Sequence, residues 1–377
     1  MIFDGHAYCF PSLKGDGGFS DPNQFRKHLQ QSIGTHHQPV WRLSDRVKGN
    51  NSQLLDTNNS SSLSSLKEID FHAGSFGRFE WTHDEEIYAK QYIPPSNEDM
   101  SYPSDRLIAE MDYAGVDKCM LHRTPFLGIG NDFIADCIKR FPNRLYGLAH
   151  TEEWLIEYDP DAAFAKIEKS IKEDGFSGFQ FLPLMLNLYD NKASWDQASF
   201  IPFWDQIAKL EVPVYFTLTP RETSYKQRGH KESWNNYHEE LKTLMRWMDR
   251  YPSVKVVQTH GLDWRSFVDG DTITLPDEVW APFDNSNLYL QLLFPICLGN
   301  VWDYPMPQIR PTIEECVKRI GSNRLIWGTD MPMVSRFWTY KQNIDFIRLY
   351  CDFLDESEIN HILGNTVAKI HGLLPTD

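Results

Sequence analysis

The sequence predicts a (β/α)8 TIM barrel with a long insertion after strand one and C-terminal covering helices. Three observations favour this fold: short apolar runs alternate with amphipathic stretches from about residue 105 onward, these runs and an earlier one at residues 2–3 make eight in order, and Pro or Gly separates helices from the strands after them. A length of 377 residues and a hydrophobic content of 41% provide a sizeable core. We therefore expect residues 1–377 to form a single barrel domain.

Each apolar run defines an expected strand, and each amphipathic stretch an expected helix. The strands are expected at residues 2–3, 118–122, 144–150, 175–183, 212–218, 254–260, 287–293 and 324–330. The helices are expected at residues 105–115, 131–141, 162–173, 200–210 and 237–250, with the covering helices at 341–353 and 356–371.

Residues 11–104 interrupt this alternation, because they are far too long for an ordinary loop between a strand and a helix. Within them, the Ser- and Asn-rich stretch 50–66 is expected to be a mobile surface loop. Residues 68–82 alternate apolar and polar side chains around two glycines, which is typical of a β-hairpin. We expect this hairpin to be a lid that closes over the barrel mouth and adds at least one residue to the pocket wall.

Charge and composition narrow the range of partners. The net charge of -15 argues against nucleic acid, whose phosphates require clustered Lys and Arg. The six cysteines form no CxxC pair, and no apolar run is long enough to cross a membrane. We expect a cytoplasmic protein that binds a small-molecule substrate, and a homodimer through exposed aromatic residues near Trp302 and Tyr304.

Polar residues at the ends of the expected strands are the candidates for chemistry, because the loops that follow parallel barrel strands converge at one face. Asp330, His260 and His6 follow three different strands and are the expected catalytic residues. Seven further residues are expected to bind substrate: Tyr8, His72, His122, Arg123, His150, Gln180 and Thr217. Arg123 suits a substrate carboxylate, since its planar guanidinium matches the two oxygens; pairing with a carboxylate of the barrel rim is the competing interpretation.

These segments resemble the amidohydrolase-related family, in the branch with metal-dependent decarboxylases, hydratases and lactone hydrolases. That family carries an HxH pair after strand one, histidines after strands five and six, and an aspartate after strand eight; the matching segments read DGHAY, PVYFTL, VVQTHG and WGTDMP. RLIWGTDMP and DYAGVDKCMLHR match best, and the ending HILGNTVAKIHGL resembles the family's C-terminal helix. The resemblance implies an enzyme with a metal held by His6, His260 and Asp330.

Two positions depart from the family pattern. Tyr8 stands where the second histidine of HxH is expected, and Thr217 stands where the strand-five histidine is expected. Neither replaces an imidazole easily as a ligand, so the cofactor is either one divalent ion, Zn or Mn, or none. His72 or Glu80 of the insertion is a candidate replacement ligand.

Three functions follow from these residues. The first is a hydrolase of a small, carboxylated or aromatic lactone or amide, with Asp330 as base on water and His6 and His260 as electrophiles. The alternative is a divalent-metal-dependent, non-oxidative decarboxylase of an aromatic or unsaturated acid. The third is a non-catalytic barrel with a degenerate metal site. We rank hydrolysis first, because a decarboxylase is expected to retain the full set of metal ligands.

Overall fold

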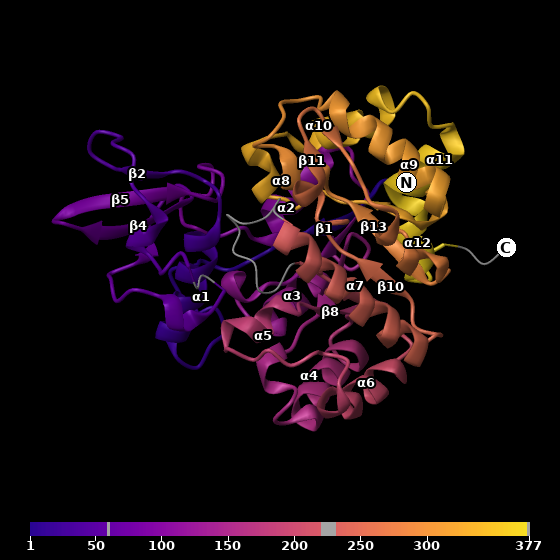
Figure 1. Ribbon diagram of the computed structural model, residues 1–377, viewed down its shortest axis with the longest axis horizontal. Coiled ribbons are helices and arrows are strands. Elements are labelled where there is room, and N and C mark those ends of the chain that lie inside the picture. The colour runs from indigo at the N-terminus through magenta and orange to yellow at the C-terminus, as the bar shows by residue number, and fades with distance from the viewer. Residues whose placement is uncertain (59–60, 220–230, 375–377) are drawn as a thin grey trace.

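In the computed structural model of the chain, residues 1–58, 61–219 and 231–374 are described, and eight parallel strands form a nearly closed barrel with helices around it (Figure 1). The predicted TIM barrel is therefore confirmed. The strand order follows the chain order without exception. The strands are β1 (Phe3–Ala7), β6 (Lys118–Leu121), β7 (Leu145–Ala149), β8 (Gly178–Phe181), β9 (Val214–Phe216), β10 (Val256–Gln258), β13 (Leu288–Leu292) and β14 (Leu325–Trp327).

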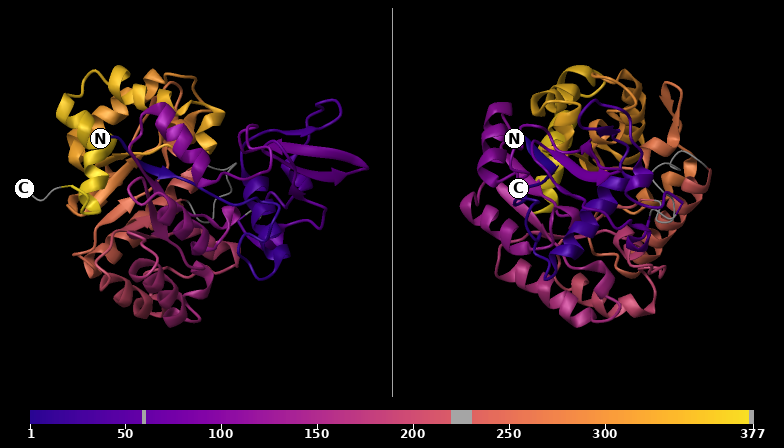
Figure 2. Two further views of the ribbon diagram at one scale, coloured as in Figure 1. Left: turned by 180° about the vertical axis from the view of Figure 1, so that it is seen from behind. Right: turned by 90° about the vertical axis from the view of Figure 1, so that its left-hand side faces the viewer.

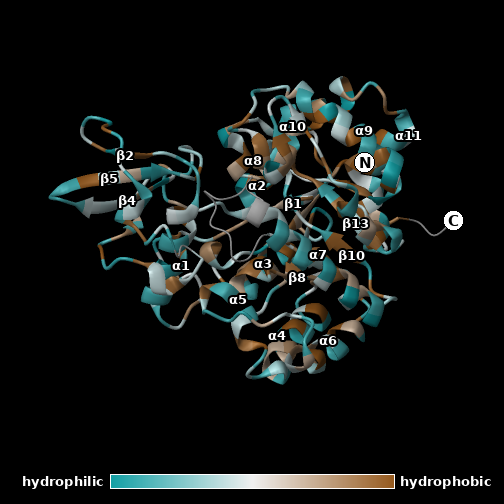
Figure 3. Cartoon of the chain, viewed as in Figure 1, coloured by the Kyte–Doolittle hydropathy of each residue, from teal (hydrophilic) through white to brown (hydrophobic). Residues whose placement is uncertain are grey.

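The outer layer consists of helices whose apolar faces cover the barrel. In Figure 3 the barrel strand β10 has the hydrophobic colour, whereas the outer helix α11 (Glu356–Asn360) has the hydrophilic colour. The crossover from β10 to β13 differs from the others, because residues 259–287 contain short 3-10 turns and a two-stranded ribbon, β11 (Val268–Asp269) and β12 (Thr272–Ile273), in place of an α-helix. The helices of the other crossovers are α2 (Ser104–Ala114), α3 (Asn131–Arg140), α4 (Pro160–Lys172), α5 (Leu184–Leu188), α6 (Ile201–Ala208), α7 (Lys231–Arg250), α8 (Phe294–Leu298) and α9 (Arg310–Ile320).

Closure of the barrel between β1 and β14 depends on a glycine. A Cβ atom at Gly5 would lie 2.5 Å from the Ile326 side chain and 2.9 Å from the Trp327 carbonyl oxygen, so a larger residue would hold the two strands apart. Just beyond this contact, the Tyr8 N–H donates to the Met331 carbonyl at 2.8 Å. The end of β1 is thereby joined to the loop that follows β14.

The C-terminal helices pack against the start of β1. They comprise α10 (Tyr340–Asp345), α11 and α12 (Thr366–Ile370), and π-helical turns at Phe346–Tyr350 and His361–Asn365 interrupt the two longer helices expected there. From α12, Val367, Ala368 and Ile370 join a buried cluster with residues of six barrel strands: Phe3, Met120, Leu148, Tyr215, Val257 and Ile326.

The segment between β1 and α2 forms a separate layer beside the barrel. It contains α1 (Pro22–Thr35) and an antiparallel sheet in the order β2-β5-β4-β3, with β2 (Val40–Arg42), β3 (His72–Ala73), β4 (Arg78–His83) and β5 (Glu86–Gln91). This sheet projects to one side of the barrel in Figure 1, and it lies in front of the barrel in the right-hand view of Figure 2.

Local sequence signals explain α1, which the sequence analysis did not predict. Asp21 caps the helix by accepting the Asn23 N–H at 2.9 Å, and Pro22 occupies its first turn. Its apolar side chains recur at helical spacing and are buried: Phe25, Leu29 and Ile33. At the other end, the buried Lys90 ammonium of β5 donates to the carbonyls of Ile33 and His36, at 2.6 and 2.5 Å, where the helix dipole favours a cation. The helix and the sheet are thereby joined.

Several expectations for this segment require correction. β3 and β4 do pair within residues 68–82, but Phe71, Phe79 and Trp81 are buried, with Phe71 stacked on both other rings, and no residue of 68–82 lines the cavity at the barrel mouth. The stretch 50–66, expected to be an unstructured loop, contains 3-10 turns and the buried Leu54 and Leu55; residues 59–60 of it lie outside the described part.

Two further observations concern assembly and membranes. Trp302 is 7% exposed, so it does not form the exposed aromatic surface on which the expected homodimer depended. The homodimer itself stays a prediction. Among the described helices, none is both long enough and apolar enough to span a bilayer.

Candidate active site

Hydrogen bonds between β1 and the loop after β14 bring His6 and Asp330 together. The His6 carbonyl accepts the backbone N–H groups of Thr329 and Asp330, at 3.2 and 2.7 Å. The buried Asp4 carboxylate strengthens this connection, because it accepts the Thr329 N–H at 3.0 Å and the Thr329 hydroxyl at 2.6 Å. Barrel closure therefore places the two side chains next to each other.

His260 and Asp330 both have a left-handed backbone conformation, with φ of 59° and 69°. Residues other than glycine adopt it at a cost of about 1 kcal/mol or more and are concentrated at functional sites. The Trp264 indole donates to the His260 carbonyl at 2.9 Å and holds this turn in place. The strained backbone directs both side chains toward His6.

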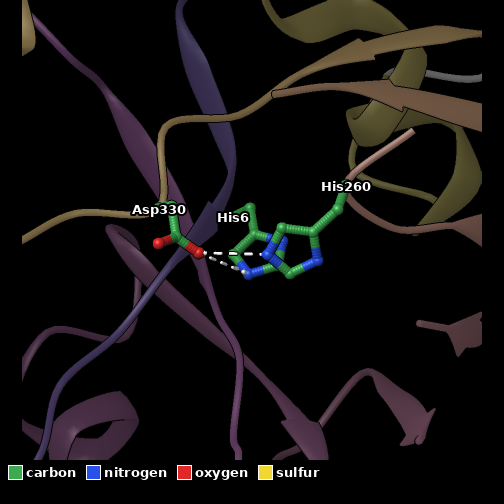
Figure 4. Close-up of side chains that lie close together, drawn as sticks. All are labelled: His6, His260 and Asp330. Atoms are coloured by element: carbon green, nitrogen blue, oxygen red, sulfur yellow. Dashed lines mark hydrogen bonds and ion pairs between the residues drawn. The ribbon is translucent and has the colours of Figure 1, made fainter. Parts of the chain in front are cut away.

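The three side chains form a compact cluster (Figure 4). Asp330 Oδ1 lies 3.2 Å from His260 Nε2 and 3.5 Å from His6 Nε2. Tyr8 adds its hydroxyl, 3.0 Å from His6 Nε2. The expected convergence of His6, His260 and Asp330 is therefore present.

Gln291 of β13 determines the protonation of His6. Its amide N–H donates to the Gly5 carbonyl at 2.8 Å, so its Oε1 faces His6 Nδ1 at 2.9 Å and accepts the proton there. The Nε2 lone pair of neutral His6 is consequently directed toward Asp330. The same Oε1 also accepts the backbone N–H of His260 at 3.4 Å, so one amide orients both histidines.

Burial controls the electrostatics of this cluster. Burial lowers the pKa of His6 well below its usual range, and His122 and His260 lower it further. Burial likewise lowers the pKa of His122, which stacks on His6 with the ring centres 3.5 Å apart. For Tyr8, burial raises the pKa, and the Asp330 charge adds to this. At neutral pH the His6 and His122 rings are uncharged and the Tyr8 phenol retains its proton.

The donor set of His6, His260 and Asp330 fits a divalent metal ion. One ligand atom from each residue lies within 4.8 Å of the other two. His6 has the outer hydrogen bond that is typical of metal-binding histidines, through Gln291. Thr217 is instead bonded to Thr259, with 2.6 Å between the hydroxyl oxygens. Two imidazoles and a carboxylate match the three-ligand sets of catalytic zinc sites, which keep one position open.

A cavity of about 280 Å³ borders the cluster at the barrel mouth. One wall comes from the loop and helix after β8 and is largely apolar: Leu182, Leu184, Met185 and Leu188. A second part of the lining comes from α1 and the residue after it and is polar: His28, Gln31, Ser32, Thr35 and His36. The insertion therefore does cover the mouth, but through α1 instead of the expected hairpin.

Six of the ten predicted site residues meet at this cavity. Five of them line it, namely Tyr8, Gln180, Thr217, His260 and Asp330. His6 is fully buried at its floor, in contact with Tyr8 and Asp330.

The other four predicted residues do not line the cavity. His122 lies behind His6 and donates from Nε2 to the Gly5 carbonyl at 3.0 Å. Arg123 is buried and donates to the carbonyls of Leu127 and Gly130, so it holds a loop together and does not act as the expected carboxylate clamp. His150 is buried beside Glu153, with 3.3 Å between Nε2 and Oε2. His72 is exposed on β3, where its Nδ1 donates to the Asp70 carbonyl.

Sequence reasoning missed the residues that the insertion and the loop after Asp330 contribute. Tyr92, His36 and Arg336 line the cavity. The Asp21-Pro22 helix start, followed by apolar residues at helical spacing, was the available signal for α1. No comparable local signal marks Tyr92 or Arg336, because both reach the cavity through tertiary packing.

We expect His28 to make the fold sensitive to acid. Burial, reinforced by His150, lowers the pKa of His28 to about 3, whereas an unfolded chain would titrate near 6.5. The stabilisation from keeping His28 neutral is therefore complete above about pH 6.5 and is lost as the pH falls toward 3. Between pH 7 and pH 5, the wild type should lose about 2 kcal/mol of unfolding free energy that a His28→Gln variant keeps.

Urea unfolding at the two pH values measures this difference. The surface variant His83→Gln is the control and should behave as the wild type does. Equal pH dependence in the wild type and the His28→Gln variant would contradict the prediction.

Comparison with known proteins identifies the family to which this chain belongs. Residues 69–373 match the family model described as Amidohydrolase. A γ-resorcylate decarboxylase of Polaromonas sp. (strain JS666 / ATCC BAA-500) is 27% identical over 234 residues, which cover 54% of this chain and 64% of the relative, less than two thirds of its length. A γ-resorcylate decarboxylase of Rhodococcus jostii (strain RHA1) is 25% identical over 268 residues, covering 63% and 73% of the two chains.

Solved structures share the fold. A probable 2-pyrone-4,6-dicarboxylic acid hydrolase of Acinetobacter baumannii superposes with a TM-score of 0.55 at 20% identity, over 73% of this chain and 90% of the other. A 2,6-dihydroxybenzoate decarboxylase from Rhizobium superposes with a TM-score of 0.53 at 19% identity, over the same shares. At these identities the superpositions show the barrel fold alone.

The relatives overturn our expectation of a hydrolase. Four curated relatives match, and each is a γ-resorcylate decarboxylase, so the similarity supports the alternative that we had ranked second. The two missing imidazoles do not exclude a decarboxylase, because three convergent ligands already fit an open metal site. From the match over residues 69–373 and the barrel that carries it, the chain is an enzyme of the amidohydrolase family.

Proposed function

We propose that this enzyme is a non-oxidative decarboxylase, a carbon–carbon lyase, of a hydroxylated aromatic acid. One observation carries the proposal: Asp330, in contact with the rings of His6 and His260, lies at the floor of a partly apolar cavity in a chain whose curated relatives are decarboxylases.

The reaction requires an acid beside the ring carbon that bears the carboxylate. A proton forms a new C–H bond at that carbon, the bond to the carboxylate then breaks, its electrons return to the ring, and CO2 leaves. Among the described residues that line the cavity, Asp330 alone has a carboxyl side chain, and we assign it the transfer of this proton. His260, 3.2 Å from the carboxyl oxygen, orients it and stabilises its charge after transfer.

A divalent ion would be held by His6, His260 and Asp330, where it would supply positive charge to phenolate and carboxylate oxygens of the substrate. The chain provides the remaining requirements. Tyr8 offers a hydroxyl that donates hydrogen bonds, and Leu184, Met185 and Leu188 form an apolar wall that excludes water from a planar ring.

The test is product analysis with purified protein supplied with Mn²⁺ or Zn²⁺. γ-Resorcylate and a set of other hydroxybenzoates are incubated, and CO2 release and the phenolic product are quantified. We expect turnover of at least one hydroxybenzoate and no acid release from lactone substrates. If none of the acids loses CO2 with either ion, the decarboxylase proposal fails, whether or not a lactone is opened.

A further inference from the structure

Arg336 is a charged wall residue of the cavity that the proposed chemistry does not use. It ends the 3-10 turn Met333–Arg336, six positions after Asp330, in the loop that follows β14. Of the described residues lining the cavity, Arg336 is the one with a lysine or arginine side chain. A guanidinium in this position favours an anionic group in the bound molecule.

The guanidinium is held at the junction of the barrel and the insertion. Its Nε donates to the Met333 carbonyl at 3.0 Å, and Nη1 donates to the Tyr92 carbonyl at 3.2 Å. The group also lies over the Tyr92 ring, 4.6 Å from the ring centre. These contacts fix its position before a ligand arrives, which lowers the entropic cost of binding.

Arg336 and Asp330 have different surroundings. Asp330 contacts His6 and His260 at the barrel floor, whereas Arg336 contacts Tyr92 of the insertion. His36 is close enough to Arg336 to be affected by its charge. Burial lowers the pKa of His36, and the positive charge of Arg336 lowers it further. We call the Asp330 cluster at the barrel floor the reacting end of the cavity; Arg336 is a separate cationic group in the cavity wall, held by Tyr92 of the insertion.

Catalysis determines which anion Arg336 can bind usefully. The divalent ion would already supply positive charge to the departing carboxylate, which loses its negative charge as CO2 forms, so a second cation on that carboxylate would stabilise the substrate more than the transition state and slow the reaction. A cation that binds a second, unreactive acidic group keeps its interaction throughout and positions the ring.

We infer that Arg336 binds a second acidic group of the substrate, and that the preferred substrate is therefore an aromatic diacid with one carboxylate at the reacting end. This inference rests on the proposed decarboxylase function, which it makes more specific.

Binding of unreactive acids tests the inference without turnover. Benzoate, isophthalate and terephthalate lack the phenol hydroxyl that activates the ring, and the two diacids differ in where the second carboxylate lies. Calorimetric Kd values are measured for the metal-supplied wild type and for Arg336→Gln, Arg336→Lys and the control Arg26→Gln. Arg26 lies on α1 outside the cavity lining and donates to the Ile69 carbonyl.

We expect the wild type to bind at least one diacid about 30-fold more tightly than benzoate, as one charge-assisted hydrogen-bond pair provides. Arg336→Gln should raise the Kd for that diacid about 30-fold and change the Kd for benzoate by less than about 3-fold. The Kd of Arg336→Lys for the diacid should lie between those of the wild type and Arg336→Gln, and Arg26→Gln should bind as the wild type does. Because the guanidinium also packs on Tyr92, the urea midpoint of each variant is recorded. If Arg336→Gln fails to fold, the wild-type selectivity and its partial loss in Arg336→Lys decide the question.

Equal binding of benzoate and both diacids by the wild type overturns the inference, and so does an equal loss of benzoate and diacid affinity in the variants. The two proposals fail separately. Diacid selectivity without decarboxylation of any hydroxybenzoate or hydroxylated aromatic diacid refutes the proposed function, whereas decarboxylation without diacid selectivity refutes the role of Arg336.

Discussion

Replacing Asp330 with Asn should lower kcat by about 10³-fold or more while leaving the fold intact, because the amide has nearly the same shape but cannot transfer a proton. The side chain is 7% exposed and contacts both His6 and His260, so no other group can take its position. Decarboxylation rates and the urea midpoint are the measurements.

Asp345→Asn is the matched control, since Asp345 lies on α10 and forms a surface ion pair with Lys341. It should retain the wild-type rate. An Asp330→Asn variant with more than about a tenth of the wild-type kcat would remove Asp330 from the mechanism, because a general acid contributes at least about 100-fold.

Removing divalent ions should abolish activity, and adding Mn²⁺ or Zn²⁺ should restore it. The expectation follows from the three convergent ligand atoms and from the Gln291 bond that directs the His6 lone pair toward Asp330. A His6→Gln variant should retain less metal after dialysis, by about 10-fold or more, since one of three ligands is lost.

Metal content by plasma emission and activity are measured on the same samples, and His83→Gln on the exposed end of β4 should behave as the wild type does. Full activity after exhaustive chelation, with no metal detected, would show that the cluster works through its own side chains alone.

The residues of the barrel were predictable because strands and helices obey local rules. Apolar runs marked the eight strands, several of them preceded by Pro or Gly, and the rule that barrel chemistry lies at the carboxyl ends of strands selected His6, His260 and Asp330. The same rule also selected His122 and Arg123, which the structure places behind the cavity. A position at a strand end does not reveal whether the side chain points into the cavity or into the surrounding loops.

The insertion was the least predictable part, for a physical reason. Phe71, Phe79 and Trp81 could cover the barrel mouth or form a core of their own, and their alternation with polar residues is the same in both cases. The competition between these two ways of burying apolar surface is decided by the packing of α1 against the sheet, where Lys90 joins them.

The sequence by itself determined the barrel, the order of its strands and the three side chains at the reacting centre, since these depend on periodicity and on where strands end. Only the tertiary structure decided that α1 forms the polar wall, that Gln291 determines which nitrogen of His6 carries the proton, and that Arg336 borders the cavity. Each of these depends on contacts between segments far apart in the chain, and local sequence patterns do not determine the energies of such contacts.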